Sequence, residues 1–443
     1  MAYTYQDAAL DYVYSFIDFD KDARPREFSQ YDLRLIEDLL ARAGNPHLKV
    51  KTVHVAGSKG KGSVASMVAS VLTTSGYKTG LFTSPHLLAF NERIRLDGKV
   101  VTNDELFSLG ERLRPEIETV NRRAVRGRLT VFELAATLGF AYFEEKGADF
   151  QVIEVGMGGR LDATNVVRPE VCAITSVSFD HMESLGNTLT QIATEKAGII
   201  KPGNVVVTSP QADEADTVIG ETCLERQAKL IRVGVDVTWR ELGYDSYRQS
   251  LEVEGRLGSY RLTIPLLGQY QLENATTAVA ALEVLIEKGF RISHDSIVEG
   301  MAGVSWPGRL QVLRRNPTVV VDGAHNADSA SRLKEALERY FDFERAILII
   351  GVSSDKDLSG IIPEFKPLFN EVIATHSIHP RAMPTANVVA ECRRHGVNAL
   401  ATEHISDALP LALSRAGEKD LICVTGSLFV VAEAIEQAEH LTQ

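Results

Sequence analysis

The sequence predicts an α/β protein with two domains, and three observations support this prediction. Apolar runs of strand length alternate with helical patterns along most of the chain. A glycine-rich turn joins an apolar run at residues 52–56 to a helical pattern at residues 61–75. Pro307 and Gly308 interrupt both periodicities late in the chain. We place the domain boundary there, which gives domains of residues 1–305 and 306–443.

The composition excludes several classes of protein. Of the 443 residues, 44% are hydrophobic and 24% are charged, which is ordinary for a soluble globular protein and not for a disordered, collagen-like or coiled-coil chain. The formal net charge of −12 argues against nucleic acid or an anionic membrane as a partner, because both attract basic surfaces. The net charge does not exclude small anionic ligands, since a binding site needs only local positive charge.

We expect a cytoplasmic protein that acts as a monomer on small molecules. Asp7, Asp11, Asp18 and Asp20 stand where a secretory signal would carry positive charge. No uncharged apolar run approaches the length of a membrane span. The four cysteines are scattered without a C-x-x-C pair, so reduced thiols are the simplest interpretation.

The C-terminal third has the most regular pattern. Apolar runs of strand length alternate with amphipathic helical patterns, and this alternation predicts parallel strands joined by right-handed crossovers. We therefore predict a Rossmann-like, doubly wound domain. The expected strands lie at 318–322, 346–351, 371–375 and 421–425, and the expected helices at 327–340, 357–369, 387–395, 405–416 and 428–439.

The N-terminal part predicts a mostly parallel sheet with a small antiparallel appendage. Buried strands are expected at 52–56, 78–82, 150–155, 171–177 and 204–208. Three shorter runs at 237–240, 251–254 and 260–264 are typical of meander strands, and a helix is expected at 271–288. With the glycine-rich turn, this pattern favours a P-loop ATPase-like domain.

The turn at residues 57–63 is the most informative segment. Backbone N–H groups of such a turn, together with the positive end of the following helix, hold polyphosphates, and Lys61 would reach the β- and γ-phosphates. The standard eight-residue motif would have Gly at position 55 and Ser or Thr at position 62. This chain has Val55 and Gly62, and the hydroxyl comes at Ser63, so the spacing is a variant.

Two further strand ends carry candidate functional residues. Glu154 ends an apolar run and is followed by a glycine-rich turn, and one carboxylate at a strand end suits Mg²⁺ bound to phosphates. His181 follows the next strand; taken alone it would more often be structural, but its place at the same expected sheet edge favours a ligand. From spacing alone, Lys196 is interpreted as a solvent-exposed lysine at a helix end. His325 and Ser427 follow strands of the second domain, where open α/β sheets bind ligands.

Ten segments, taken together, match a known family in the expected order. They lie at 57–63, 83–87, 130–133, 154–165, 180–181, 195–201, 269–275, 306–309, 322–326 and 426–427. On these residues the chain resembles the folylpolyglutamate synthase/dihydrofolate synthase branch of the Mur ligase superfamily. One departure is Ser58-Lys59, where the family usually has Thr-Asn.

The resemblance implies an ATP-dependent amide ligase that adds L-glutamate to dihydropteroate or reduced folates through an acyl phosphate. It implies two magnesium ions and a carbamylated Lys196 that meets one of them. Lys61 and His325 would join Lys196 as catalytic residues. The implied ATP contacts are Gly57, Gly60, Lys61, Gly62, Ser63, Asn274, Arg309, Asp322 and Ser427; the implied metal ligands are Ser84, Glu154 and His181; the implied pterin-side contacts are Thr130, Val131, Phe132, Glu133, Leu161, Asp162 and Ala163.

Three other functions compete with this interpretation. A cell-wall Mur ligase would share the ATP-binding residues, although residues 83–87 and 158–165 favour a folate substrate. A P-loop switch or regulatory ATPase would hydrolyse nucleotide regardless of glutamate, and it would leave the second domain unexplained. A catalytically inactive binding protein would not need Lys61, Glu154, His181 and Lys196 together.

Overall fold

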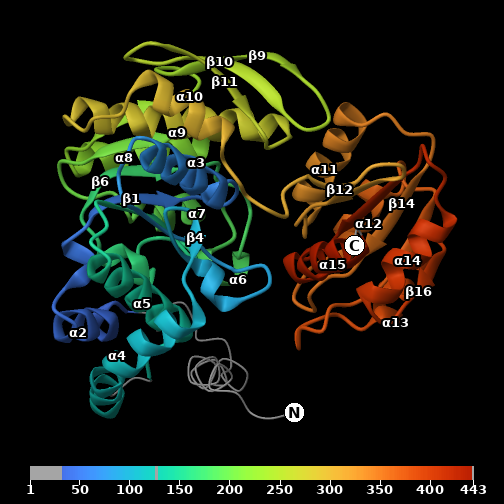
Figure 1. Ribbon diagram of the computed structural model, residues 1–443, viewed down its shortest axis with the longest axis horizontal. Coiled ribbons are helices and arrows are strands. Elements are labelled where there is room, and N and C mark those ends of the chain that lie inside the picture. Colours follow the sequence, from blue (N-terminus) through green and yellow to red (C-terminus); the bar gives the residue numbers. More distant parts are fainter. Residues whose placement is uncertain (1–31, 125–127, 442–443) are drawn as a thin grey trace. The chain divides into compact units, whose positions relative to one another are not determined.

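The computed structural model describes residues 32–124 and 128–441 of the chain, which forms two compact units (Figure 1). The four acidic residues discussed above, Asp7 to Asp20, lie outside the described residues. Unit 1 holds the described residues up to Glu241, with Leu251–Thr263 and Tyr270–Val304; unit 2 holds Leu242–Ser250, Ile264–Gln269 and the residues from Ser305 onward. Among the helices of the described ranges, none is both long and apolar enough to cross a bilayer.

Unit 1 is built on one eight-stranded sheet with the order β4-β3-β2-β5-β1-β6-β7-β8. The six strands from β2 to β8 in this order run parallel, and β3 and β4 extend the sheet antiparallel at one edge. The strands are β1 (Lys51–Ala56), β2 (Thr79–Phe82), β3 (Ile94–Leu96), β4 (Lys99–Val100), β5 (Phe150–Glu154), β6 (Pro169–Ile174), β7 (Val205–Thr208) and β8 (Lys229–Arg232). The predicted mostly parallel sheet is thereby confirmed.

Helices cover both faces of this sheet. In Figure 1, α3, α9 and α10 lie on one side and α5 on the other. The helices are α2 (Arg34–Arg42), α3 (Lys61–Thr74), α4 (Asn103–Arg123), α5 (Val131–Glu145), α6 (Met182–Leu185), α7 (Leu189–Ala197), α8 (Asp213–Glu225), α9 (Gln269–Glu287) and α10 (His294–Ala302), with short 3-10 turns at Pro46–Leu48, Phe90–Arg93 and Ala163–Val166.

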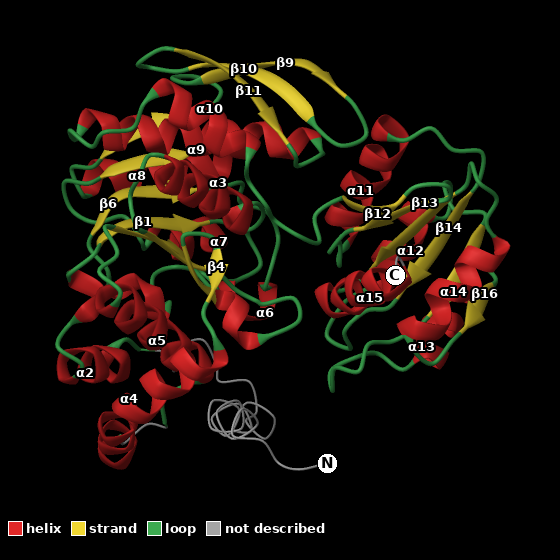
Figure 2. Cartoon of the chain, in the orientation of Figure 1, coloured by secondary structure: helices red, strands yellow, loops and turns green. Residues whose placement is uncertain are grey.

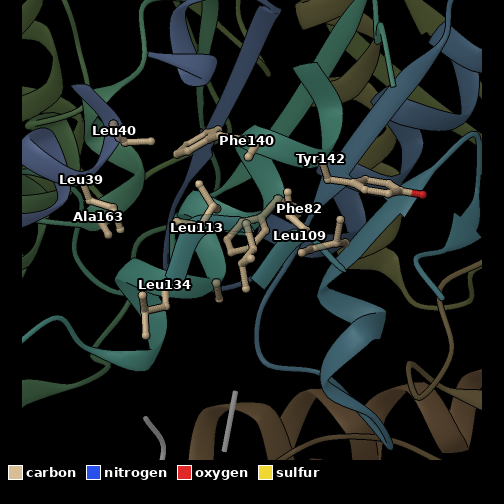
Figure 3. Packing of buried hydrophobic residues seen from close by; sticks show 14 of the residues in the cluster. Leu39, Leu40, Phe82, Leu109, Leu113, Leu134, Phe140, Tyr142 and Ala163 are labelled. Atoms are coloured by element: carbon tan, nitrogen blue, oxygen red, sulfur yellow. The ribbon is translucent and has the colours of Figure 1, made fainter. Parts of the chain in front are cut away.

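A large apolar cluster packs α2, α4 and α5 against the part of the sheet that contains β2 and β5. Figure 3 shows Leu39 and Leu40 of α2, Leu109 and Leu113 of α4, and Phe140 of α5 among its members. The five side chains are between 0% and 7% exposed. Burial of this apolar surface fixes α5, and with it the N-terminal end of that helix, against the sheet.

A second, three-stranded sheet has the order β11-β10-β9 and is the expected appendage (Figure 2). Its strands are β9 (Thr238–Tyr244), β10 (Gln249–Glu254) and β11 (Ser259–Ile264). Glu283 of α9 is fully buried and accepts hydrogen bonds from the amides of Arg256 and Leu257 and from the hydroxyl of Tyr260, at 2.8–3.1 Å. One buried carboxylate therefore fastens the turn between β10 and β11 to α9.

Unit 2 is a doubly wound α/β sheet, as predicted, with the order β12-β13-β17-β14-β15-β16. All neighbours are parallel except β12, which pairs antiparallel with β13. Separate apolar clusters on the two faces hold α11, α12 and α13 on one side and α14 and α15 on the other. The elements are β12 (Gln311–Arg314), β13 (Thr318–Val321), α11 (Ala327–Tyr340), β14 (Ala346–Ile350), α12 (Leu358–Phe365), β15 (Glu371–Ala374), α13 (Thr385–Arg394), β16 (Ala399–Ala401), α14 (Ile405–Arg415), β17 (Leu421–Thr425) and α15 (Leu428–Leu441).

Two segments that precede residue 305 in the chain belong to unit 2. The side chain of Gln249 is fully buried there and donates to the carbonyl oxygens of Leu266 and Gly268, at 2.6 and 2.9 Å. It also accepts a hydrogen bond from the hydroxyl of Tyr340, at 2.8 Å. The chain therefore passes through unit 2 twice before residue 305, from which it stays in that unit. A single domain boundary at 305/306 stays a prediction.

Close packing between α3 and α10 predicts a specific loss of stability. A Cβ at Gly300 would lie 2.6 Å from Cα of Val71 in α3, so Gly300→Ala must push two helix backbones apart. We expect this substitution to lower the free energy of unfolding by about 1–3 kcal/mol, measured from the midpoint of urea unfolding at an unchanged slope.

Gly303→Ala is the matched control, because the nearest atom to its added Cβ lies at 3.4 Å. We expect Gly303→Ala to cost little. Equal losses for Gly300→Ala and Gly303→Ala would contradict the packing argument.

Candidate active site

The strand order of unit 1 brings four loops to one edge of the sheet. The neighbours β2, β5, β1 and β6 are parallel, so their carboxyl ends lie together. Val55 of β1 is in register with Glu154 of β5, and Ala56 is in register with Ile174 of β6. The expectation that Glu154 lies beside the phosphate loop is confirmed by this pairing.

The phosphate loop, residues 57–63, needs glycine at two of its positions. Gly57 has φ 146° and Gly60 has φ 87°, values that L side chains rarely adopt. A Cβ at Gly57 would overlap Oγ1 of Thr175, and one at Gly60 would overlap Oδ1 of Asn274. The loop therefore lies in direct contact with the end of β6 and with α9.

The N-terminus of α3 is not capped by its own N-cap residue. That residue is Gly60, which makes no side-chain hydrogen bond to the helix. The first amides of a helix, here those of Lys61, Gly62 and Ser63, have no intrahelical acceptor, and the helix dipole adds positive charge. These amides are the hydrogen-bond donors that would bind an anionic phosphate chain.

Gln271 connects the phosphate loop to Asn274, and the sequence analysis missed it. Its Nε2 donates to Oγ of Ser63, at 3.3 Å, and its Oε1 accepts from Nδ2 of Asn274, at 2.9 Å. Both amide side chains are buried, with 1% and 6% exposure. Their i, i+3 spacing on one helix face is the signal that could have identified Gln271.

Lys196 is buried, so the interpretation from spacing alone is wrong. Its side chain is 3% exposed at the end of α7, and its Nζ donates to the carbonyl oxygen of Gly57, at 2.8 Å. Burial, reinforced by the nearby Lys61 ammonium, lowers the pKa of Lys196 to about 7. Its amine is therefore partly neutral near physiological pH, which is unusual for a lysine.

Glu154 and Ser84 come together, and both offer oxygen atoms to a hard cation. The amide of Ser84 donates to Oε2 of Glu154, at 3.0 Å, and Glu154 is 5% exposed. His181 follows β6 with φ 50°, and its Nε2 lies 3.9 Å from Oδ1 of Asp180. Within the described ranges, no three His, Cys, Asp or Glu residues form a metal cluster. The expected set contains only two such residues and fits an ion that takes its remaining ligands from phosphate and water.

Four of the seven residues expected at the pterin side stand at the start of α5. Thr130 is the N-cap and accepts from the amide of Glu133, whose carboxylate accepts in return from the amide and hydroxyl of Thr130. Val131 belongs to the apolar cluster beneath. The ring of Phe132 lies so close to Gly156 that a Cβ there would overlap it. This capping box therefore borders the glycine-rich turn after Glu154.

Asp162 organises the same turn from within. It is 6% exposed and accepts hydrogen bonds from the amide of Met157, at 2.9 Å, and from the amide and hydroxyl of Thr164. Burial raises the pKa of Asp162, and these hydrogen bonds oppose the rise. Leu161 is half-buried beside it, and Ala163 lies in the apolar core.

His54 completes this buried hydrogen-bonded chain. The Thr164 hydroxyl has one proton and donates it to Asp162, so Nε2 of His54, at 2.9 Å, must be the donor to Thr164. Burial lowers the pKa of His54 to about 3 and keeps the ring neutral.

Unit 2 gathers its own group of expected residues at the carboxyl ends of β13 and β17. Asp322 is 7% exposed and accepts from the amides of Leu310 and Ala324, both at 2.9 Å. Burial raises its pKa, and the Arg309 guanidinium opposes the rise. Nδ1 of His325 lies 2.8 Å from the carbonyl oxygen of Gly323 and donates to it, which leaves Nε2 to face another group.

Ser427 stands just before α15, where its Oγ accepts from the amide of Val430, at 3.2 Å. The neighbouring strand ends are tied together by the hydroxyl of Thr425, which donates to the carbonyl oxygen of Asp322, at 2.7 Å. The expected site residues thus form two groups. Unit 1 holds the phosphate loop, Asn274, Ser84, Glu154, His181 and Lys196; unit 2 holds Arg309, Asp322, His325 and Ser427.

Two family models match the chain and together span most of it. Residues 55–282 match the Mur ligase middle domain, and residues 308–428 match the Mur ligase glutamate ligase domain. The first match contains the phosphate loop, Glu154, Lys196 and Asn274. The second contains Arg309, Asp322, His325 and Ser427.

Named relatives and solved structures agree with these matches. The dihydrofolate synthase/folylpolyglutamate synthase of Bacillus subtilis is 32% identical over 403 residues, which are 90% of this chain and 93% of the relative. Mycobacterium tuberculosis folylpolyglutamate synthase, solved with ADP and AMPPCP, has a TM-score of 0.89 at 31% identity and covers 97% of this chain and 99% of its own.

Escherichia coli FolC, solved in complex with DHPP and ADP, has a TM-score of 0.85 at 27% identity over 97% of this chain and 98% of its own. The domain matches, the extent of these similarities and the site geometry agree: the chain belongs to the Mur ligase family, in its folylpolyglutamate synthase/dihydrofolate synthase branch.

Proposed function

We propose that this protein is an ATP-dependent ligase that joins L-glutamate to dihydropteroate or to reduced folates. The observation that supports this most strongly is the N-terminus of α3, with Glu154 and the buried Lys196 at the same sheet edge. The names of the relatives supply the substrate class, since they are folylpolyglutamate and dihydrofolate synthases. Solved relatives bind ADP and AMPPCP, which supports ATP as the phosphoryl donor.

In this proposal the phosphate loop binds the triphosphate. The amides at the start of α3 and the Lys61 ammonium stabilise the charge on the phosphoryl group as it moves. Gly57 and Gly60 allow the backbone to approach the phosphates, and Asn274 contacts the nucleotide from α9. Ser84, Glu154 and His181 would hold magnesium, which would supply positive charge to offset that of the phosphates.

The expected residues of unit 2 are assigned to the same reaction. Arg309 and Asp322 contact the nucleotide, Ser427 lines the same strand edge, and His325 acts near the reacting groups. We also propose residues 1–305 and 306–443 as the two functional domains, acting as a monomer. The pterin side is assigned to Thr130, Val131, Phe132 and Glu133, and to Leu161, Asp162 and Ala163.

The chemistry follows from the stability of carboxylates. A carboxylate does not react with an amine in water, so the carboxylate oxygen first attacks the γ-phosphorus of ATP and expels ADP. The nitrogen of L-glutamate then attacks the acyl carbon and expels phosphate, and its proton passes to a base. Water must be excluded, because it would hydrolyse the acyl phosphate.

Substrate use tests the proposal directly. We expect release of ADP with dihydropteroate or tetrahydrofolate to depend on added L-glutamate, measured with a coupled assay on the full-length protein. ADP release that is indifferent to glutamate would favour a regulatory ATPase. Activity with a UDP-sugar acid and none with a pteroate would favour a cell-wall ligase.

Removal of Lys61 or of the Glu154 charge tests the nucleotide site. We expect Lys61→Ala and Glu154→Gln each to lower kcat/KM by a factor of about 100–1,000. The first removes a positive charge that stabilises the moving phosphoryl group, and the second weakens the site for the cation that would do the same. Far-ultraviolet circular dichroism checks that the fold survives. Lys78→Ala removes an exposed lysine before β2, at the other end of the strands, and should leave activity unchanged. Near-normal ligation by Lys61→Ala would remove the phosphate-loop assignment.

The state of Lys196 has its own test. A neutral amine adds CO2 to give a carbamate and a proton, and the pKa of Lys196, lowered to about 7 by burial, makes the neutral form available at neutral pH. We expect activity to fall when CO2 is removed and to return with bicarbonate, more completely as the pH is raised through 7. Lys196→Arg should not respond to bicarbonate. Full activity of the wild-type protein without CO2 would contradict carbamylation.

A further inference from the structure

The segment after β6, residues 176–181, is fastened to the phosphate loop by its backbone. The amides of Ser58 and Lys59 both donate to the carbonyl oxygen of Ser176, at 2.9 and 3.2 Å. The Ser58 hydroxyl donates to the carbonyl oxygen of Ser178, at 2.9 Å, and accepts from the amide of Ser178, at 3.0 Å. These contacts hold the first half of the segment and stop before Asp180.

The second half is held by an ion pair. Nζ of Lys59, within the phosphate loop, lies 3.1 Å from Oδ2 of Asp180. The Lys59 and Asp180 side chains are 24% and 13% exposed, so both charges are partly removed from water. A pair in such surroundings is screened less than a surface pair, so loss of one partner changes the local charge balance more than it would at the surface.

The position of this pair means that the charge of Asp180 can affect phosphate binding. Asp180 stands next to His181, and its carboxylate contacts Lys59 of the phosphate loop, so it lies near the region that would receive phosphates. Asp180 and Lys59 also act in opposite directions on the pKa of the buried Lys196, which places both charges close to it. A carboxylate here whose charge Lys59 did not offset would repel phosphates more strongly.

We propose that Lys59 and Asp180 form a positioning pair that holds the 176–181 segment, and with it His181, against the phosphate loop and offsets the Asp180 charge beside bound phosphate. The inference rests on the proposed function for the reaction that the pair serves. Neither residue is assigned a contact with substrate. The pair acts through the placement of the segment and through charge compensation.

A double-mutant cycle on the full-length protein tests the pair. The probe is a fluorescent ATP analogue with magnesium, and the readout is its dissociation constant. We expect Lys59→Met to weaken binding about tenfold in the wild-type background and less than about twofold in the Asp180→Asn background, because in the second case the ion pair is already absent. Lys59→Arg keeps the charge and should stay close to the wild-type protein.

Amide hydrogen exchange reports whether the segment is held. We expect Lys59→Met to speed exchange in the peptide that covers residues 176–185 and to leave the peptide of β1 unchanged. In the ligation assay, the KM for ATP should rise more than kcat falls, as for a residue that positions a binding group.

A second ion pair of the same unit provides the control. Lys288 and Glu170 lie 2.9 Å apart with side-chain exposures of 34% and 30%, and Glu170 is near the start of β6, away from the phosphate loop. Lys288→Met should change neither the dissociation constant nor the exchange of residues 176–185.

Equal effects of Lys59→Met in both backgrounds, or no effect in either, would overturn the proposal. Failure of the proposed function has a different signature: the wild-type protein would then show no glutamate-dependent ADP release, while nucleotide binding and exchange would still test the pair.

Discussion

The site depends on one constraint, the order of the parallel strands in unit 1. Because β2, β5, β1 and β6 are neighbours and run in the same direction, the residues that follow them must meet at one edge. Ser84, Glu154, the phosphate loop and His181 are far apart in sequence, and no local interaction would bring them together. The apolar residues that bury these strands on both faces therefore determine where the chemistry takes place.

Positive charge is concentrated around the phosphate loop. The protein has a net charge of −12, yet Lys59 and Lys61 of the phosphate loop both act on the buried Lys196. Burial there favours the neutral amine of Lys196, whereas the amides at the start of α3 retain their positive ends. An acidic protein can therefore offer a cationic site to phosphates, because local geometry and desolvation outweigh the overall charge.

Much of this arrangement could be predicted from the sequence, for identifiable reasons. Glycines between a buried strand and a helix predicted the phosphate loop, and alternating strands and helices predicted both sheets. The short edge strands β12 and β16 were missed, since they are only three or four residues long and little buried. The burial of Lys196 could not be deduced from its place at a helix end, because the Gly57 carbonyl that it contacts lies 139 residues away in the sequence. Gln249 likewise joins unit 2 through contacts that no local pattern contains.

The account is tested most directly by following one oxygen atom. Dihydropteroate labelled with ¹⁸O in its carboxyl group is incubated with the wild-type protein, ATP, magnesium and L-glutamate, and the released phosphate is analysed by mass spectrometry. If the carboxylate attacks the γ-phosphorus and glutamate later displaces phosphate, each phosphate carries one labelled oxygen. Amide formed together with unlabelled phosphate would contradict the account.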